Sequence, residues 1–201
     1  MTTPGFRKGR SSGGRSSPAR DGGDGFISGS MFSQAQILHL MKAEFARARR
    51  HGLSLGCLLV QVDRVPQLVD LYGAELRNTL RQTLIEIVRE HTRGADLLGI
   101  IKEDRYMLVL PHTTVEQARI VADRIHAIFR KHEVAVGGRA LDLTLSVGIS
   151  ATGQSEAMFF DTLVGQAEAA LEFATERGGD RVVSFGETQL LGQDPPGPTQ
   201  S

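Results

Sequence analysis

Apolar residues follow two different periods along the chain, and each period predicts one kind of element. Residues 97–101 and 106–110 are apolar runs separated by a charged break, a pattern typical of two buried strands joined by a tight hairpin. Residues 53–62 are apolar on both faces, as in a central strand, and residues 141–149 alternate between apolar and polar positions. With a short run at 181–185, the pattern predicts a sheet.

Other stretches place apolar residues three or four positions apart, as on one face of a helix. Ser33 can cap the first of these helices and Gly52 can end it, whereas Gly73 breaks the second in two. The predicted helices cover about residues 33–51, 64–71, 76–91, 113–131 and 155–177. This order of elements predicts an α/β sandwich with a mixed sheet around the central hairpin.

The two ends of the chain differ in composition from the middle. Residues 1–30 hold eight Gly and six Ser, with five Lys or Arg against two Asp, a composition that buries too little apolar surface to fold alone. We expect a disordered, mildly cationic tail there, and a second disordered tail at residues 187–201, which are rich in Pro and Gly. One folded domain is expected between them, over residues 31–186.

The overall charge excludes some partners. Lys and Arg together number 23, as do Asp and Glu, so no basic excess favours nucleic acid or a membrane surface. The single Cys57 lies in an apolar run and is expected to be a small buried hydrophobe, which fits a reducing cytoplasm. No apolar run is long enough to predict a membrane span, and the six histidines show no metal-ligand spacing.

Several short segments resemble the GGDEF domain of bacterial diguanylate cyclases, over roughly residues 37–184. The matching segments are residues 46–52, 70–73, 93–96, 122–125 and 143–150, and the spacing is without gaps from Leu55 to Arg130. The resemblance implies a mainly antiparallel sheet flanked by helices, with a signature β-hairpin. It also implies the family's reaction, in which a homodimer joins two GTP molecules into cyclic di-GMP with the help of metal ions.

The residues that the family uses for catalysis are mostly replaced. By the resemblance, the signature Gly-Gly-Asp/Glu-Glu-Phe falls on the degenerate hairpin Lys102, Glu103, Asp104, Arg105 and Tyr106. Lys102 and Glu103 replace the glycines whose missing side chains let the backbone approach phosphate. Two-residue turns also favour glycine at such positions because they need positive φ.

Other family positions have changed as well. The first acid of the family's metal-binding pair falls on Gln61, while the second is kept as Asp63. The guanine-contacting Asn and Asp fall on Val69 and Asn78, and the phosphate-contacting Lys and Arg fall on Glu176 and Asp180. Because a ligand, base contacts and two cations are lost together, we expect no catalytic residues, no bound metal or other cofactor, and no enzyme activity.

A second family site is retained. In the family that the chain resembles, an Arg-x-x-Asp motif and an arginine on the following helix bind cyclic di-GMP. By this resemblance, the corresponding residues are Arg93, Asp96 and Arg124. A guanidinium can grip guanine or phosphate with two bonds, and a carboxylate can accept from guanine N–H groups. The alternative is that Arg93 and Asp96 form an ordinary surface ion pair between a helix and a strand.

The leading hypothesis is therefore a catalytically inactive signalling domain that binds cyclic di-GMP at these three residues and relays binding to a protein partner. The alternative is a nucleotide-independent scaffold for protein interactions, and an active diguanylate cyclase is the least favoured reading. The sequence names neither the partner nor the oligomeric state, so a homodimer stays open.

Overall fold

The computed structural model describes residues 31–102, 104–153 and 158–191. The predicted disordered tail at 1–30, Glu103 of the hairpin and residues 192–201 lie outside the described residues. No helix in the described part of the chain is long and apolar enough to cross a membrane.

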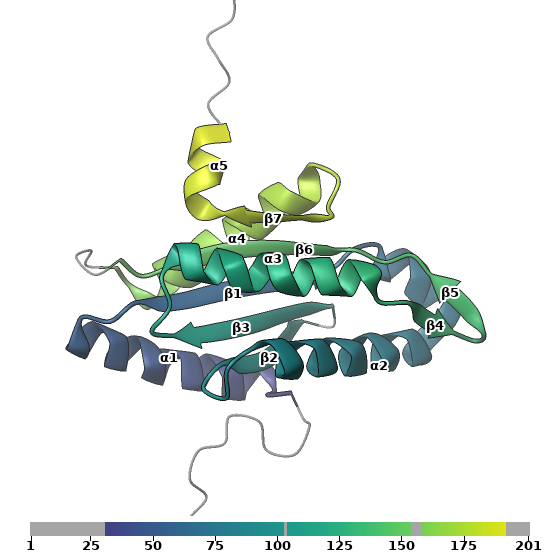
Figure 1. Ribbon diagram of the computed structural model, residues 1–201, viewed down its shortest axis with the longest axis horizontal. Helices are drawn as coiled ribbons and strands as arrows, with labels where there is room; N and C mark the ends of the chain where they lie inside the picture. Colours follow the sequence, from purple (N-terminus) through teal and green to yellow (C-terminus); the bar gives the residue numbers. More distant parts are fainter. Residues whose placement is uncertain (1–30, 103, 154–157, 192–201) are drawn as a thin grey trace, which may run out of the picture.

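The centre of the domain is a five-stranded sheet in the order β2-β3-β1-β6-β7 (Figure 1). Its strands are β1 (Leu55–Val62), β2 (Leu97–Lys102), β3 (Arg105–Pro111), β6 (Leu145–Ala151) and β7 (Arg181–Ser184). All neighbours pair antiparallel except β6 and β7, which are parallel. The prediction of a mixed, mainly antiparallel sheet is confirmed, and β1 is its central strand.

Four long helices cover the sheet: α1 (Gln34–His51), α2 (Val65–His91), α3 (Val115–Lys131) and α4 (Phe160–Glu176). Side chains of β1 alternate between two apolar clusters, because successive residues of a strand point to opposite faces. Leu58 and Val60 pack in the cluster that contains the buried residues of α2 and α3. Cys57 and Leu59 pack in the cluster formed with α1 and α4. The domain is therefore a helix–sheet–helix sandwich (Figure 1).

Local signals place the helix ends where the sequence predicts them. Ser33 caps α1 in a reciprocal capping box, and Gly52 ends the helix in a left-handed conformation at φ 64°. Gly73 has φ 62° and ψ −146°, so it divides α2 into a short and a long part. Thr114 caps α3, with Gln117 closing the capping box.

Three sequence predictions need correction. Residues 141–149 are not one strand, because residues 139–141 form strand β5 (Arg139–Leu141), which pairs with β4 (Val134–Val136) as a separate hairpin. Leu143, between β5 and β6, is nevertheless buried, so the alternation continues across the break. Helix α4 begins at Phe160 and not near residue 155. Residues 187–191 are not part of a disordered tail, because they belong to helix α5 (Phe185–Leu191).

The closest packing in the core joins β6 to α4. A Cβ added to Gly148 would lie 2.3 Å from both the carbonyl oxygen of Ala167 and the amide nitrogen of Leu171. These are backbone atoms of α4, so only a residue without a side chain lets the helix lie this close to the strand. On the same face, Cys57 is fully buried, as predicted, and this burial raises the pKa of its thiol to about 12.

We predict opposite effects for two glycine substitutions. Gly148→Ala should lower the free energy of unfolding by about 2 kcal/mol or more, because α4 must move off the sheet. Gly165→Ala should raise it by about 0.5–1 kcal/mol, since a Cβ there meets nothing within 4 Å and alanine favours the helix. Urea denaturation of both variants and the wild type measures the difference. Equal stability of all three would contradict the close packing of α4 on β6.

Candidate functional site

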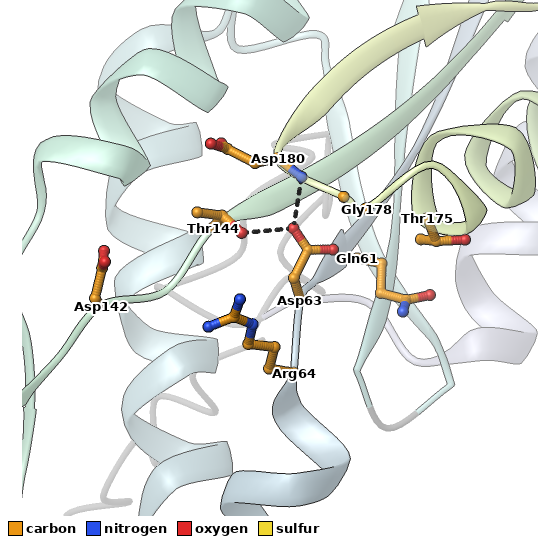
Figure 2. A pocket seen from close by; sticks show the side chains of 9 residues that line it. Gln61, Asp63, Arg64, Asp142, Thr144, Thr175, Gly178 and Asp180 are labelled. Carbon is orange, nitrogen blue, oxygen red and sulfur yellow. Dashed lines mark hydrogen bonds between the residues drawn. The ribbon is translucent and has the colours of Figure 1, made fainter.

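The structure brings two of the replaced positions, Gln61 and Asp180, to one cavity of about 490 Å³, together with the retained Asp63 (Figure 2). The cavity lies where β1 ends and where β6 and β7 begin, next to the end of α4. Its lining residues are Gln61, Asp63, Arg64, Asp142, Thr144, Thr175, Gly178, Gly179 and Asp180.

Asp63 is the central acid of this cavity, and its carboxylate is bonded on both oxygens. Oδ2 accepts from the Thr144 hydroxyl at 2.7 Å and from the Asp180 backbone N–H at 3.0 Å, while Oδ1 accepts from the Ser146 hydroxyl at 2.7 Å. Gly179, at φ 73°, passes so close that a Cβ would lie 2.9 Å from the carboxylate. Asp63 thus ties the end of β1 to the starts of β6 and β7.

Gln61, which stands at the family's first metal position, also has an internal partner. Its side-chain oxygen accepts from Arg105 Nε at 2.7 Å, and the two residues face each other across the β1–β3 pair. Asp104 and Arg105 of the degenerate hairpin are half-buried, Lys102 is exposed, and Tyr106 is buried. Burial raises the pKa of Tyr106. The amide at 61 and the reversed charge at 105 therefore satisfy each other.

Asp180 takes part in a cluster that sequence reasoning missed. Its carboxylate lies 2.9 Å from His126 Nε2 and 3.2 Å from Arg130 Nη1, both on α3. The only sequence signal was the i,i+4 spacing of the two basic residues on the predicted helix. Of the other replaced positions, Glu176 and Asn78 are exposed, and Val69 packs partly against the core.

The family's reaction implies a metal ion, but the residues present do not fit one. In the described ranges, no group of three or more His, Cys, Asp and Glu side chains could hold a metal ion. The retained acid, Asp63, already accepts three bonds, and Gln61 is a neutral amide engaged with Arg105. Magnesium requires near-octahedral oxygen ligands, usually including a carboxylate that is free to coordinate.

A second cavity, of about 430 Å³, brings together all three residues of the retained motif. It lies between the end of α2, the turn at residues 92–96 and helix α3. Its lining residues are Glu90, His91, Thr92, Arg93, Asp96, Leu110, Thr113, Gln117, Ile120, Val121 and Arg124.

Asp96 is only 3% exposed, so the alternative of an ordinary surface ion pair does not describe its environment. Its carboxylate accepts from the backbone N–H of Arg93 at 2.8 Å, whereas the Arg93 residue itself is exposed. Burial raises the pKa of Asp96, against the Arg93 N–H bond and the charges of Arg93 and Arg124. The main chain therefore holds Asp96 and leaves the Arg93 side chain at the surface of the cavity.

Arg124 approaches the same cavity from α3. Its Nη2 donates to the carbonyl oxygen of His91, the last residue of α2, at 2.5 Å. A cation at a helix C-terminus is favourable because the last carbonyls lack partners and carry partial negative charge. Ile120, one turn earlier, is 65% exposed and adds an apolar wall. The cavity thus combines two arginines, the buried Asp96, the exposed Glu90 and apolar side chains.

Comparison with known families identifies the domain. Residues 30–181 match the family described as "Diguanylate cyclase, GGDEF domain". This match covers most of the chain, so the chain belongs to the GGDEF family and the resemblance seen in its sequence is confirmed.

Curated relatives agree with this family. The chain is 26% identical to diguanylate cyclase DosC of Escherichia coli (strain K12) over 145 residues, which are 71% of this chain and 31% of that protein. It is 24% identical to diguanylate cyclase A of Treponema denticola over 149 residues, 72% of this chain and 38% of the relative. The chain therefore spans about a third of the length of these relatives.

Solved structures show the same fold. The FimX GGDEF domain of Pseudomonas aeruginosa superposes with a TM-score of 0.70 at 20% identity, covering 76% of this chain and 93% of that one. The DgcB GGDEF domain of Caulobacter crescentus, solved in complex with c-di-GMP, has a TM-score of 0.71 at 12% identity, covering 78% and 92%. Diguanylate cyclase SiaD of P. aeruginosa, in complex with its activator SiaC, has a TM-score of 0.70 at 28% identity, covering 76% and 58%.

We predict that Asp63 stabilises the fold without metal. In Asp63→Asn the amide oxygen can still accept from the Asp180 N–H, but the bonds lose their charge assistance. The free energy of unfolding should fall by about 1.5–3 kcal/mol, equally with and without magnesium. Asp142→Asn is the matched control, because Asp142 lines the same cavity but is exposed; its stability should stay within about 0.5 kcal/mol of wild type. A wild-type melting temperature that rises with Mg²⁺ or Mn²⁺, and no longer rises in Asp63→Asn, would contradict this role.

Proposed function

We propose that this chain is a GGDEF domain without diguanylate cyclase activity, which binds cyclic di-GMP in the 430 Å³ cavity and relays binding to a protein partner. The observation that carries the proposal is the gathering of Arg93, Asp96 and Arg124 around one cavity. In the other cavity, in contrast, Gln61 and Asp63 are already engaged with donors of the protein.

The chemistry of the cavity suits a guanine dinucleotide. Cyclic di-GMP offers phosphate oxygens and guanine acceptors, which a guanidinium binds with two parallel bonds, and guanine N–H groups, which a carboxylate accepts. The exposed Arg93 can turn toward such a ligand, while buried Asp96 is held at a fixed place by its main-chain bond. Ile120 offers an apolar surface to a base. The DgcB domain with its bound c-di-GMP is a precedent for a ligand on this fold.

Several changed contacts together support the proposed loss of catalysis. Gln61 and Asp63 are engaged with protein donors, and Asp180 and Glu176 place negative charge where the family has cations. A triphosphate with bound metal would meet repulsion and no free carboxylate pair, so positioning and charge stabilisation both fail.

The second candidate is a scaffold that binds proteins without a nucleotide. It is favoured by one contact: Arg124 already has a partner in the His91 carbonyl, which explains an arginine at this place without any ligand. SiaD, a relative solved with its activator SiaC, shows that a diguanylate cyclase can bind a protein. A titration with cyclic di-GMP separates this candidate from the first.

We predict that the protein forms no cyclic di-GMP from GTP and magnesium, because the contacts of metal, base and phosphate are all changed. Gln61→Asp should not restore turnover, since Arg105 is placed to pair with the new carboxylate. Chromatography of overnight incubations checks both. Product from the wild type at rates typical of the family would refute the loss of catalysis.

We predict that cyclic di-GMP binds in the micromolar range or tighter, about −8 kcal/mol, and more weakly at higher salt. Arg93→Ala should weaken binding roughly tenfold to a hundredfold by removing a charge-assisted bond. Asp96→Asn should also weaken binding while it keeps the fold, because an amide oxygen still accepts from the Arg93 N–H. Isothermal titration calorimetry measures each variant.

The control for this titration is Arg89→Ala, which removes an exposed cation from the same helix end without altering the lining of the cavity. Its affinity should equal that of the wild type. Arg124→Ala also removes a bond to α2, so its affinity must be interpreted together with its melting temperature, which measures any loss of stability. Absence of heat and of thermal shift with wild type at saturating ligand would favour the scaffold.

A further inference from the structure

Side chains of helix α3 line the 430 Å³ cavity on one side and contact the C-terminal part of the described chain on another. Gln117, Ile120, Val121 and Arg124 line the 430 Å³ cavity. Another set of its side chains reaches the C-terminal segment of the described chain, which comprises β7 and α5. His126 and Arg130 contact Asp180, just before β7, and Arg119 contacts Glu187, just after it. Both ends of β7 are therefore tied to α3.

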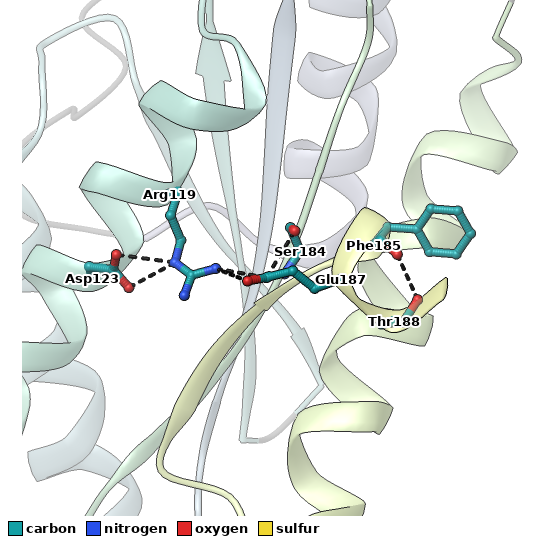
Figure 3. Close-up of polar contacts among 6 residues, drawn as sticks. All are labelled: Arg119, Asp123, Ser184, Phe185, Glu187 and Thr188. Carbon is teal, nitrogen blue, oxygen red and sulfur yellow. Dashed lines mark hydrogen bonds and ion pairs between the residues drawn. The ribbon is translucent and has the colours of Figure 1, made fainter. Parts of the chain in front are cut away.

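In the contact between Arg119 and Glu187, one guanidinium nitrogen bonds both carboxylate oxygens (Figure 3). Arg119 Nη1 donates to the two carboxylate oxygens of Glu187 at 2.9 and 2.7 Å. Glu187 also accepts from the backbone N–H of Ser184 at 2.6 Å and from its hydroxyl at 2.9 Å. Burial alone would raise the pKa of Glu187, but the bonds from Ser184 and Arg119 hold this pKa below its ordinary value. One carboxylate thus caps α5 and fastens it to α3.

Helix α5 depends on such contacts. It has seven residues and none of them is buried, whereas isolated helices shorter than about 12 residues are marginal in water. Figure 3 also shows the Thr188 hydroxyl donating to the Phe185 carbonyl, a bond within the helix itself. Local opening of α5 should therefore require far less free energy than unfolding of the core.

Opening leaves neither charge without a partner. Arg119 Nε also donates to both oxygens of Asp123, one turn further along α3, at 3.0 and 3.1 Å. When Glu187 leaves, Arg119 keeps this partner, and Glu187, whose side chain is 40% exposed, is hydrated. Exposed ion pairs contribute little net stability. The contact is therefore suited to open and close reversibly.

We propose that α5 is a releasable strap, that the Arg119–Glu187 contact is its latch, and that occupancy of the cavity on the other edge of α3 opens it. The first two parts stand on the contacts above, and the third rests on the proposed binding of cyclic di-GMP. A ligand that draws Arg124 into the cavity pulls α3 away from α5. A displacement of about 1 Å, common for helix shifts, takes the Arg119–Glu187 bonds of 2.9 and 2.7 Å beyond hydrogen-bonding distance. The strap is then the part of the domain that reports the ligand to a partner.

Hydrogen exchange of the full chain tests the latch without any ligand. Arg119→Ala and Glu187→Gln should each speed exchange in residues 185–191 by roughly fivefold, with exchange in β1 and β3 unchanged. The effects of the two substitutions should be less than additive in the double variant, because both weaken the same contact. Asp123→Asn, which leaves the latch intact, is the control and should exchange as the wild type does. Unchanged exchange in both single variants would overturn the latch.

The ligand experiment separates this inference from the proposed function. Saturating cyclic di-GMP should speed exchange of residues 185–191 in the wild type, and should not do so in Arg93→Ala. If calorimetry shows binding but the exchange of α5 stays constant, the relay through the strap is wrong and the binding site stands. If calorimetry shows no binding, the proposed ligand is wrong, and the variants alone decide whether the latch exists.

Discussion

The carboxylate of Asp63 joins segments that are far apart in the chain, and the cavity around it depends on that contact. Its three bonds come from residues 81, 83 and 117 positions later in sequence, so each closes a long loop. The acceptors are ionised and the donors are two hydroxyls and a main-chain N–H, the combination that gives short, strong hydrogen bonds. Asp63 can hold β1, β6 and β7 together only while its oxygens face inward.

That geometry supports the proposed loss of catalysis. A magnesium ion, which prefers octahedral oxygen ligands, would compete with these three donors for the same carboxylate oxygens. The acid retained from the family therefore has a structural use in this domain. Retention of a residue in a motif does not establish retention of its role, because the role depends on which partners the neighbouring positions supply.

Much of the fold could be predicted from the sequence, and the reason is local. The helix caps at Ser33 and Thr114, the break at Gly73 and the apolar run of β1 from Leu55 to Val60 each depend on near neighbours or on a simple period. The errors lie where distant contacts decide. Helix α5 has no apolar periodicity and forms because Glu187 meets Arg119 and Ser184. The break between β5 and β6 follows from pairing with β4, which alternation alone cannot show.

The candidate sites divide in the same way. The family resemblance grouped Arg93, Asp96 and Arg124 in one site, and the structure brings them to one cavity. The sequence around Asp96 could not show that this residue is buried and bonded to the main chain of Arg93. The sequence also could not show that two charged residues at changed family positions have partners inside the domain. Arg105 bonds Gln61, and Asp180 contacts both His126 and Arg130. Buried or half-buried polar groups are costly when unpaired and tolerable when bonded. The changes at these positions are therefore mutually consistent, because the side chains at these positions now hold the strands and α3 together.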